Sequence, residues 1–177
     1  MSTETTVVPV PVVRRTGDSA DFFDMAASGR LLLRRCVRCS TARGPQEQVC
    51  PRCFATEHRA EAAAGPATLV SWAVVHRSPV PVVAAPYVAG IVEVEEGPWV
   101  LARVLTVPGE PMRVGLPLRI AVAPAADGGE AVVLARTEAA SPAGLLVASP
   151  AGLLVASPAG PVVASPAGRI DEGTEIA

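Results

Sequence analysis

The stretch RLLLRRCVRCSTARGPQEQVCPRCFATEHR, residues 30–59, contains all four cysteines of the chain as two Cys-x-x-Cys pairs separated by ten residues. Two residues between cysteines allow a tight turn to direct both thiolates at one ion, and two such turns supply a tetrahedral set. The spacing therefore predicts a zinc ribbon with the ligands Cys36, Cys39, Cys50 and Cys53. Because four sulfurs leave no coordination position for water or substrate, the metal is expected to stabilise the fold rather than to perform chemistry.

Other roles for the cysteines are less well supported by the sequence. The N-terminus shows no basic segment followed by an apolar core and a cleavage site, so we expect a cytoplasmic protein without disulfides. A redox-active Cys-x-x-Cys motif usually lies on a thioredoxin-like βαβ unit, and no such pattern is visible. An iron site of the rubredoxin type uses the same ligands, and the spacing leaves iron open. Zinc is favoured because no cluster-type spacing accompanies the motif.

Arginine is concentrated around the cysteines. Seven arginines lie between residues 30 and 59, against Glu47 and Glu57, although the net charge of the whole chain is only −2. One interpretation is that these arginines solvate a ribbon whose zinc–thiolate centre is formally negative, and the other is an anion-binding site. His58 follows Cys53 by five residues. We expect it to lie at the surface or beside the site, because four thiolates already complete the ligand set.

Two short segments precede the ribbon. Residues 1–17 contain VVPVPVV, which is too short and too proline-rich for a membrane helix and predicts an extended, mobile arm. Residues 18–29, DSADFFDMAASG, predict a short helix with Asp18 or Ser19 as N-cap and Gly29 at its C-terminal end. A helix of this length is marginal in isolation, so we expect it to dock on the core or on a partner.

The sequence after the ribbon, which we assign to residues 30–64, changes to strand patterns over residues 65–138. Five β-rich runs alternate there with breaks that contain Gly or Pro: ATLVSWAVVHR, YVAGIVEVEE, PWVLARVLTV, LRIAVAP and AVVLART. The number of strands and the short breaks suit an antiparallel barrel of the OB type, whereas residues 78–86 form a proline-rich loop. The sequence thus predicts a mainly β fold with a short N-terminal helix, a rubredoxin-like zinc ribbon and a five-stranded OB-type barrel.

Residues 139–177 form a low-complexity tail. Units of eight residues, SPAGLLVA, SPAGLLVA and SPAGPVVA, begin at Ser141, Ser149 and Ser157. This period is shorter than that of most solenoids, and each proline removes a backbone donor. We therefore expect a disordered tail, although its apolar clusters leave weak self-association open.

Several motifs together resemble a known family over about residues 18–136: FFDMAASGRLLLRRCVRC, CPRC, VSWAVVHR, PYVAGIVEVEEG and MRVGLPLRI. These motifs resemble the zinc-ribbon plus OB-fold proteins of acyl-CoA metabolism, first catalogued as a domain of unknown function. Family members act as non-catalytic subunits beside thiolase-superfamily enzymes, including lipid-transfer-type thiolases, steroid side-chain aldolases and acyltransferases, or are fused to acyl-CoA hydratase modules. The resemblance therefore implies a hetero-oligomer with a thiolase-superfamily enzyme and help in binding a coenzyme A thioester.

The resemblance extends to few individual residues besides the metal ligands. It implies a loose coenzyme-binding role for His76, Arg77 and Tyr87, which flank the proline-rich loop. The family often has an aromatic residue in this loop, where this chain has Val82 and Val83. His76 has no Ser, Cys or carboxylate beside it in the sequence, so we expect a strand-end residue rather than a catalytic base.

A second class of function competes with the accessory subunit, because zinc ribbons and OB barrels also bind nucleic acids on other proteins. Base stacking requires exposed aromatic residues on the barrel, and only Trp72, Tyr87 and Trp99 are available there, with a negative net charge. An independent enzyme is not expected either, because no nucleophile–base set or open metal site is visible. We therefore predict a non-catalytic subunit that binds neither nucleic acid nor a membrane.

Overall fold

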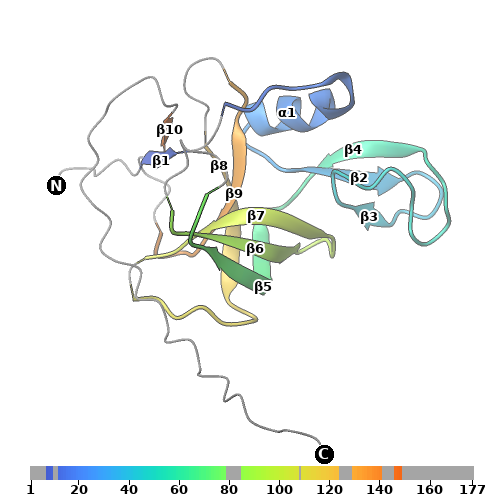
Figure 1. Cartoon of the computed structure of the whole chain (residues 1–177). Helices are drawn as coiled ribbons and strands as arrows, with labels where there is room; N and C mark the ends of the chain where they lie inside the picture. The colour runs from blue at the N-terminus through green and yellow to red at the C-terminus, as the bar shows by residue number, and fades with distance from the viewer. Residues whose placement is uncertain are drawn as a thin grey trace, which may run out of the picture.

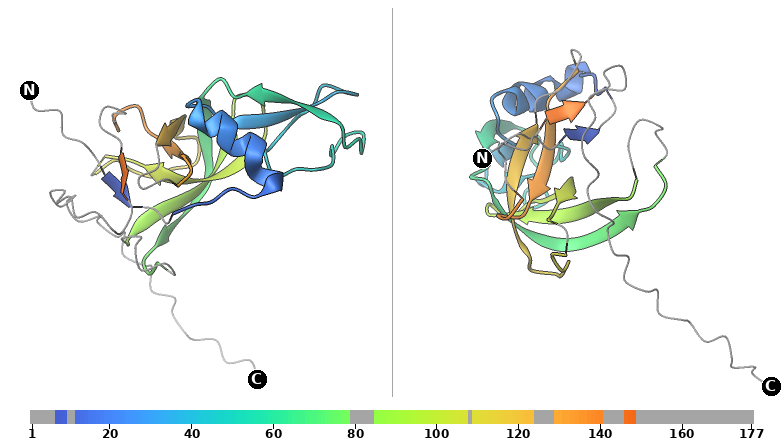
Figure 2. Two further views of the ribbon diagram at one scale, coloured as in Figure 1. Left: turned by 90° about the horizontal axis from the view of Figure 1, so that it is seen from above. Right: turned by 90° about the vertical axis from the view of Figure 1, so that its left-hand side faces the viewer.

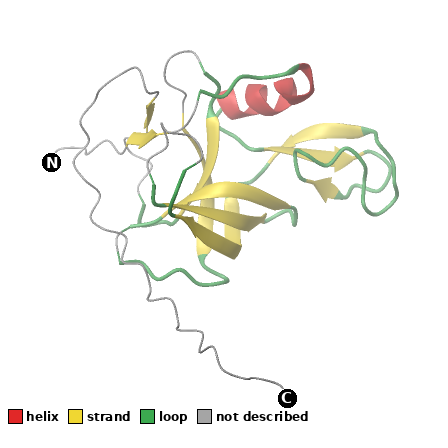
Figure 3. Cartoon of the chain, viewed as in Figure 1, coloured by secondary structure: helices red, strands yellow, loops and turns green. Residues whose placement is uncertain are grey.

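The computed structural model describes residues 7–9, 12–78, 85–107, 109–123, 129–140 and 146–148. Within them the chain is mainly β with one α-helix, as Figure 3 shows. A small sheet that carries the cysteines projects from one side of a barrel, the helix lies above their junction, and the short strands β1 and β10 lie on the opposite side (Figure 1). The predicted fold class is confirmed.

The helical segment begins with a 3-10 turn, η1 (Gly17–Ser19), and continues as α1 (Ala20–Ala27). Ser19 occupies the N-cap position, although its hydroxyl bonds back to the preceding turn rather than to the helix. Gly29 follows the helix with a φ of 80°, and its N–H donates to the carbonyl of Ala26 at 2.8 Å. This left-handed cap is the conformation that glycine adopts without steric cost, as the sequence predicted.

The apolar side of α1 packs within this chain. Phe23 and Ala26 are buried, Phe22 packs against the barrel core, and the two phenylalanine rings meet edge to face at 5.1 Å. The sequence left open whether these residues face the core or a partner, and the structure places them against the core.

The cysteine-bearing sheet has three antiparallel strands in the order β3-β2-β4. Its strands are β2 (Leu32–Cys36), β3 (Ala42–Arg43) and β4 (His58–Ala62). The first cysteine pair begins at the last residue of β2, Cys36, and the second lies in the long connection from β3 to β4. The sheet thus brings two segments that are distant in sequence to the same end.

Five strands close a barrel in the order β5-β6-β7-β9-β8: β5 (Pro66–Val75), β6 (Tyr87–Val94), β7 (Trp99–Leu105), β8 (Pro117–Ala123) and β9 (Val132–Arg136). All five predicted runs form strands. The expectation of an antiparallel barrel was wrong for one pair, because β7 and β9 run parallel. An odd number of strands cannot alternate in direction around a closed ring, so one neighbouring pair has to be parallel.

Strands β5 and β6 are long and curved, and Figure 2 shows them reaching beyond the rest of the barrel. The register between them shifts at Leu69 and Ser71, which marks a β-bulge. Next to the bulge, where Gly90 pairs with Trp72, a β-carbon on Gly90 would lie 2.7 Å from Cγ2 of Val104, so any other residue would force the surroundings to shift. Glycine therefore permits the close approach that bends the sheet at this point.

One apolar core joins the small sheet to the barrel. Leu31, just before β2, and Leu33, within it, are buried in the same cluster as Leu69, Val92 and Leu118 of the barrel. The leucine run that the sequence assigned to the first ribbon strand therefore also contributes to the barrel core. This shared core fixes the position of the ribbon relative to the barrel.

Small parts of the predicted arm and tail are among the described residues. Strand β1 (Val7–Pro9) pairs in parallel with β10 (Leu146–Ala148) from the first repeat. Arg15 forms ion pairs with Asp24 and Glu130, both at 2.6 Å. Residues 1–6 and 149–177 lie outside the described part of the chain, so the mobility of the arm and the disorder of the tail remain predictions.

Candidate functional site

The first cysteine turn is closed by two backbone hydrogen bonds. The N–H of Ser40 donates to the carbonyl of Cys36 at 2.9 Å, and the N–H of Cys36 donates to Thr41 at 3.0 Å. Ser40 has a φ of 58°, in the left-handed region. This conformation reverses the chain directly after Cys39, so that the thiols of Cys36 and Cys39 point to the same side.

The second cysteine turn repeats this geometry. The N–H of Phe54 donates to the carbonyl of Cys50 at 2.9 Å, the N–H of Cys50 donates to Ala55 at 2.9 Å, and Phe54 has a φ of 60°. A phenylalanine in the left-handed region is sterically unfavourable. The same chain reversal at both pairs is what a facing pair of metal-binding turns requires.

The structure brings the four predicted ligands together. Their sulfur atoms all lie within 4.8 Å of one another, with 3.6 Å between Cys36 and Cys53 and 3.5 Å between Cys39 and Cys50. All four cysteines are free rather than disulfide-bonded. A tetrahedron with metal–sulfur bonds of about 2.3 Å has edges of roughly 3.8 Å, so the cluster fits a four-coordinate ion with little movement.

The four thiols receive hydrogen bonds unevenly. The hydroxyl and N–H of Thr41 lower the pKa of Cys39 to about 6, and the N–H of Cys39 lowers the pKa of Cys36. The N–H of Ala55 acts in the same direction on Cys53, but burial and the neighbouring sulfurs outweigh it and raise the pKa of Cys53 to about 11. A metal has to displace the protons that remain, which makes its affinity depend on pH.

His58 lies opposite Cys36 in the pairing of β4 with β2 but is not part of the sulfur cluster. Its Nε2 lies 2.6 Å from Nη1 of Arg34, and its Nδ1 lies 3.1 Å from the carbonyl of Thr56. Because a guanidinium only donates, Nε2 accepts, and the ring proton on Nδ1 is directed at Thr56. Both ring nitrogens are thus engaged, in agreement with the expectation that His58 is not a ligand.

The residues that the family resemblance linked to a coenzyme lie at the far end of the β5–β6 hairpin. His76 and Arg77 are exposed just beyond β5, and Tyr87 is half-buried at the start of β6, opposite Val75. Val82 and Val83, like the rest of residues 79–84, lie outside the described residues. The hairpin therefore groups the three candidates at one end of the barrel, away from the cysteines.

Sequence reasoning missed Arg103, which lies beside these candidates. Its guanidinium lies 5.1 Å from the ring centroid of Tyr87, and burial lowers the pKa of Arg103. Arg103 pairs with Ala89 on β6, two residues from Tyr87, so the two side chains are diagonal neighbours on one face. Strand alternation on β6 and β7 could have suggested this contact, but the register was not readable from the sequence.

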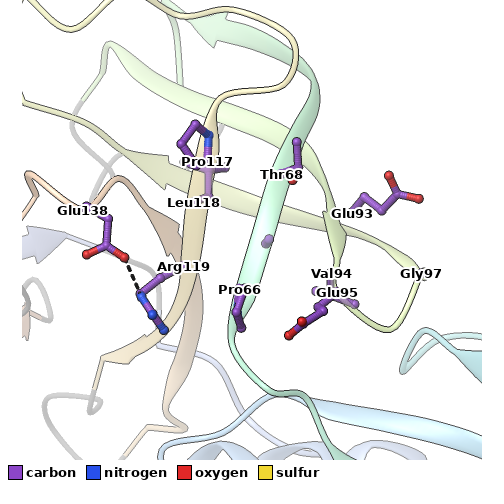
Figure 4. A pocket seen from close by; sticks show the side chains of 11 residues that line it. Pro66, Thr68, Glu93, Val94, Glu95, Gly97, Pro117, Leu118, Arg119 and Glu138 are labelled. Atoms are coloured by element: carbon purple, nitrogen blue, oxygen red, sulfur yellow. Dashed lines mark hydrogen bonds and ion pairs between the residues drawn. The ribbon is translucent and has the colours of Figure 1, made fainter.

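A shallow pocket of about 460 Å³ lies on the outer face of β8, β5 and β6. The ion pair of Arg119 with Glu138, at 2.5 Å, lies on one side of β5, and Glu93 and Glu95 lie on the other (Figure 4). None of the predicted site residues lines this pocket. Its mixed charges and open shape give it no clear ligand.

The fold and the cysteine cluster define a zinc-ribbon protein with an OB-type barrel, and comparison with known families agrees. Residues 23–59 match the family model described as the rubredoxin-like zinc ribbon domain of ChsH2, and residues 60–123 match its C-terminal OB-fold domain. The two adjoining matches span more than half of the 177 residues. The chain belongs to the ChsH2 family of zinc-ribbon and OB-fold proteins.

Three individual proteins resemble this chain to different degrees. The chain is 28% identical, with a TM-score of 0.61, to a chain of a solved structure described as "Ltp2-ChsH2(DUF35) aldolase", over 70% of this chain and 96% of that one. It is 32% identical to a probable enoyl-CoA hydratase alpha subunit of Thermomonospora curvata, over 62% of this chain but only 34% of the relative. This chain thus spans about a third of the length of that curated relative. A DUF35-family protein of unknown function from Sulfolobus solfataricus matches more distantly, at 15% identity and a TM-score of 0.46, over 59% of this chain and 77% of that one.

No helix in the described part of the chain is long and apolar enough to cross a membrane.

Proposed function

We propose that this chain is a non-catalytic accessory subunit that binds a thiolase-superfamily enzyme of acyl-CoA metabolism in a hetero-oligomer. The observation that carries the proposal is the likeness to the aldolase structure named with both Ltp2 and ChsH2, because it extends over 96% of the matched chain at 28% identity. The hydratase relative adds support for an acyl-CoA setting. Because this chain spans about a third of that relative, the likeness supports a shared module rather than hydratase chemistry in this chain.

The absence of catalysis is supported by the chemistry of the described residues. Over this part of the chain, the one group of three or more His, Cys, Asp or Glu side chains able to hold a metal is the tetra-cysteine cluster. Four sulfurs around one ion leave no position for substrate. His76 is exposed at a strand end, which is not the enclosed setting of a typical general base.

The same proposal assigns zinc to the cysteine cluster as a structural cofactor. Cys36, Cys39, Cys50 and Cys53 would each supply one thiolate, and the sulfur spacing suits this. The ion would supply the bonds that hold the two turns together. Divalent zinc is preferred to iron because the family model is that of a zinc ribbon.

Contact with a coenzyme A thioester, shared with the partner enzyme, is the finer part of the proposal. Arg77 is exposed, and no ion pair with it occurs among the described residues, so its guanidinium is available for a phosphate. His76 and Tyr87 lie at the same end of the hairpin. The Arg103–Tyr87 contact holds the tyrosine ring in place beside them.

Co-expression with each thiolase-superfamily enzyme encoded in the same genome tests the proposal. We expect one of them to co-elute with this chain in size-exclusion chromatography and to show higher thiolysis or retro-aldol activity in its presence, while this chain alone converts no acyl-CoA. Full activity of every candidate enzyme alone, without co-elution, would contradict the proposal. Salt-sensitive retention of single-stranded nucleic acid by this chain would instead support the nucleic-acid alternative.

The coenzyme contact has its own test in that complex. Arg77→Ala should raise the KM of the partner for acyl-CoA more than it lowers kcat, because a phosphate contact lies far from the reacting thioester. Arg113→Ala removes the same charge from another exposed loop and serves as the control. Equal kinetics for the two variants would exclude a role of Arg77 in coenzyme binding.

A further inference from the structure

Two arginines of the ribbon lie inside it rather than on its surface. Arg43 is 0% exposed and Arg34 is 6% exposed. The two residues are also directly opposite each other in the pairing of β3 with β2. Like charges facing each other across a sheet repel, and a buried guanidinium is costly without a compensating charge. The sequence suggested that the arginines either solvate the ribbon or form an anion site, and neither interpretation explains why these two are buried.

Arg43 is held by backbone carbonyls on both sides of the second cysteine pair. Its Nη1 donates to the carbonyls of Gln48 at 2.9 Å and Glu47 at 3.4 Å, just before the pair. Its Nη2 donates to Thr56 at 3.3 Å and Glu57 at 3.5 Å, just after the pair. Nε has no partner among the described atoms. One side chain thus ties together the two flanks of the turn that carries Cys50 and Cys53.

No carboxylate neutralises either arginine in the described part of the chain. The ion pairs found there involve Arg15, Arg35 and Arg119. Arg34 donates from Nε to the carbonyl of Pro45 at 2.9 Å, and its other contact is the neutral ring nitrogen of His58. Carbonyls orient a guanidinium but do not cancel its charge. Two buried positive charges are therefore left without a counter-ion of their own.

We infer that Arg34 and Arg43 are the internal counter-ions of the metal–thiolate centre, and that Arg43 also positions the second cysteine turn. A divalent ion with four thiolates carries two excess negative charges, and the two guanidinium groups balance them within one small sheet. This inference rests on the proposed metal site and adds a requirement to it. The ribbon interior is neutral when the divalent ion is bound, and positively charged when the thiols are protonated and the ion is absent.

Zinc affinity of the full chain tests the inference through charge-matched variants. In competition with a chromophoric chelator, Arg43→Gln should weaken zinc binding about tenfold or more, the range expected for partners just outside a ligand set. Arg43→Lys keeps the charge but not the fork of donors, and should recover most of the affinity. Arg59→Gln removes the same charge from an exposed position of β4 and should leave the affinity unchanged. Arg34→Gln provides a second test if Arg43→Gln does not fold.

The reduction potential of iron bound in the same site distinguishes two effects of Arg43→Gln: loss of a positive charge and loosening of the cysteine turn. Loss of a nearby positive charge disfavours the more negative ferrous centre, so Arg43→Gln should lower the reduction potential. Loosening would admit water and raise the potential instead. A lowered potential with recovery in Arg43→Lys supports the inference.

Three results would overturn the inference. If Arg43→Gln and Arg34→Gln bind zinc as tightly as Arg59→Gln, neither arginine contributes to zinc affinity. If Arg43→Lys binds zinc as weakly as Arg43→Gln, the contribution of Arg43 comes from the geometry of its hydrogen bonds rather than from its charge. A raised reduction potential in Arg43→Gln would likewise assign the role of Arg43 to the geometry of the turn. Failure of the wild-type chain to bind any metal would instead reject the proposed zinc site itself.

Discussion

The interiors of the barrel and of the ribbon are built from opposite kinds of side chain. In the five strands of the barrel, the fully buried residues are aliphatic, such as Leu69, Val92 and Leu134. In the ribbon beyond Leu33, they include Arg43 and Cys50. The barrel can be stabilised by removal of apolar surface from water, whereas the guanidinium of Arg43 gains nothing from burial alone.

The ribbon also exposes large apolar side chains, as the barrel does at Trp99 and Leu101. Around the cysteine turns, Val37, Val49 and Phe54 have exposed fractions of 52%, 47% and 78%. A segment that exposes its few large apolar side chains and buries arginine cannot depend on a hydrophobic core. The comparison indicates that the barrel is stable by packing, and that the ribbon depends on metal bonds and backbone hydrogen bonds.

Loss of the metal should produce the largest effect and separate the two regions. Replacing Cys39 by Ser should remove binding energy on the order of 10 kcal/mol that is coupled to ribbon folding. Hydrogen exchange measured by mass spectrometry should then show loss of protection over residues 34–62, while strands β5–β9 stay protected. Uniform loss over the barrel would show that the two regions unfold as one unit, and unchanged protection would show that the ribbon needs no metal.

A change in the barrel core should lower the stability of the protein without affecting its zinc affinity. Leu69→Ala should lower the free energy of unfolding by about 2–5 kcal/mol, because it leaves a cavity in the shared core. Zinc affinity should stay within about twofold of the wild type, because the residue lies outside the ribbon. Denaturant unfolding and chelator competition measure the two quantities. Leu101→Ala, at a position that is 72% exposed, is the control, and an equal loss there would refute packing as the cause.

The smallest expected effect concerns backbone conformation in the ribbon. Phe54→Gly should raise the free energy of unfolding by about 0.5–1 kcal/mol, because relief of left-handed strain exceeds the added freedom of the unfolded chain. The exposed ring contributes little burial that could be lost. Thermal unfolding of the zinc-loaded protein measures the change. Phe54→Ala keeps the β-carbon and should not stabilise, so a gain in both variants would point to the ring instead.

In the barrel, hydrophobic patterning predicts the individual strands but not how they pair. Each of the five strands was predictable, because β-rich runs are local and are bounded by Gly or Pro. The parallel pairing of β7 with β9 was not, because it follows from closure of the ring. The sharing of Leu31 and Leu33 between ribbon and barrel depends likewise on how two regions meet.

The candidate sites differ in the same way. The four metal ligands were predictable because the spacing within each Cys-x-x-Cys pair already fixes the local turn. The contact between Tyr87 and Arg103 depends on the register of two strands, which has no signature in one sequence.

The sequence by itself determined the cysteine turns, the left-handed cap at Gly29 and the strands of the barrel, because each depends on residues close together in the chain. The tertiary structure decided which arginines are buried. Seven arginines surround the cysteines in the sequence, and nothing local distinguishes Arg34 and Arg43 from the exposed Arg38 and Arg52. Their burial depends on carbonyls and a histidine ring supplied by separate segments, because a charged group enters an interior only where other parts of the chain provide its partners.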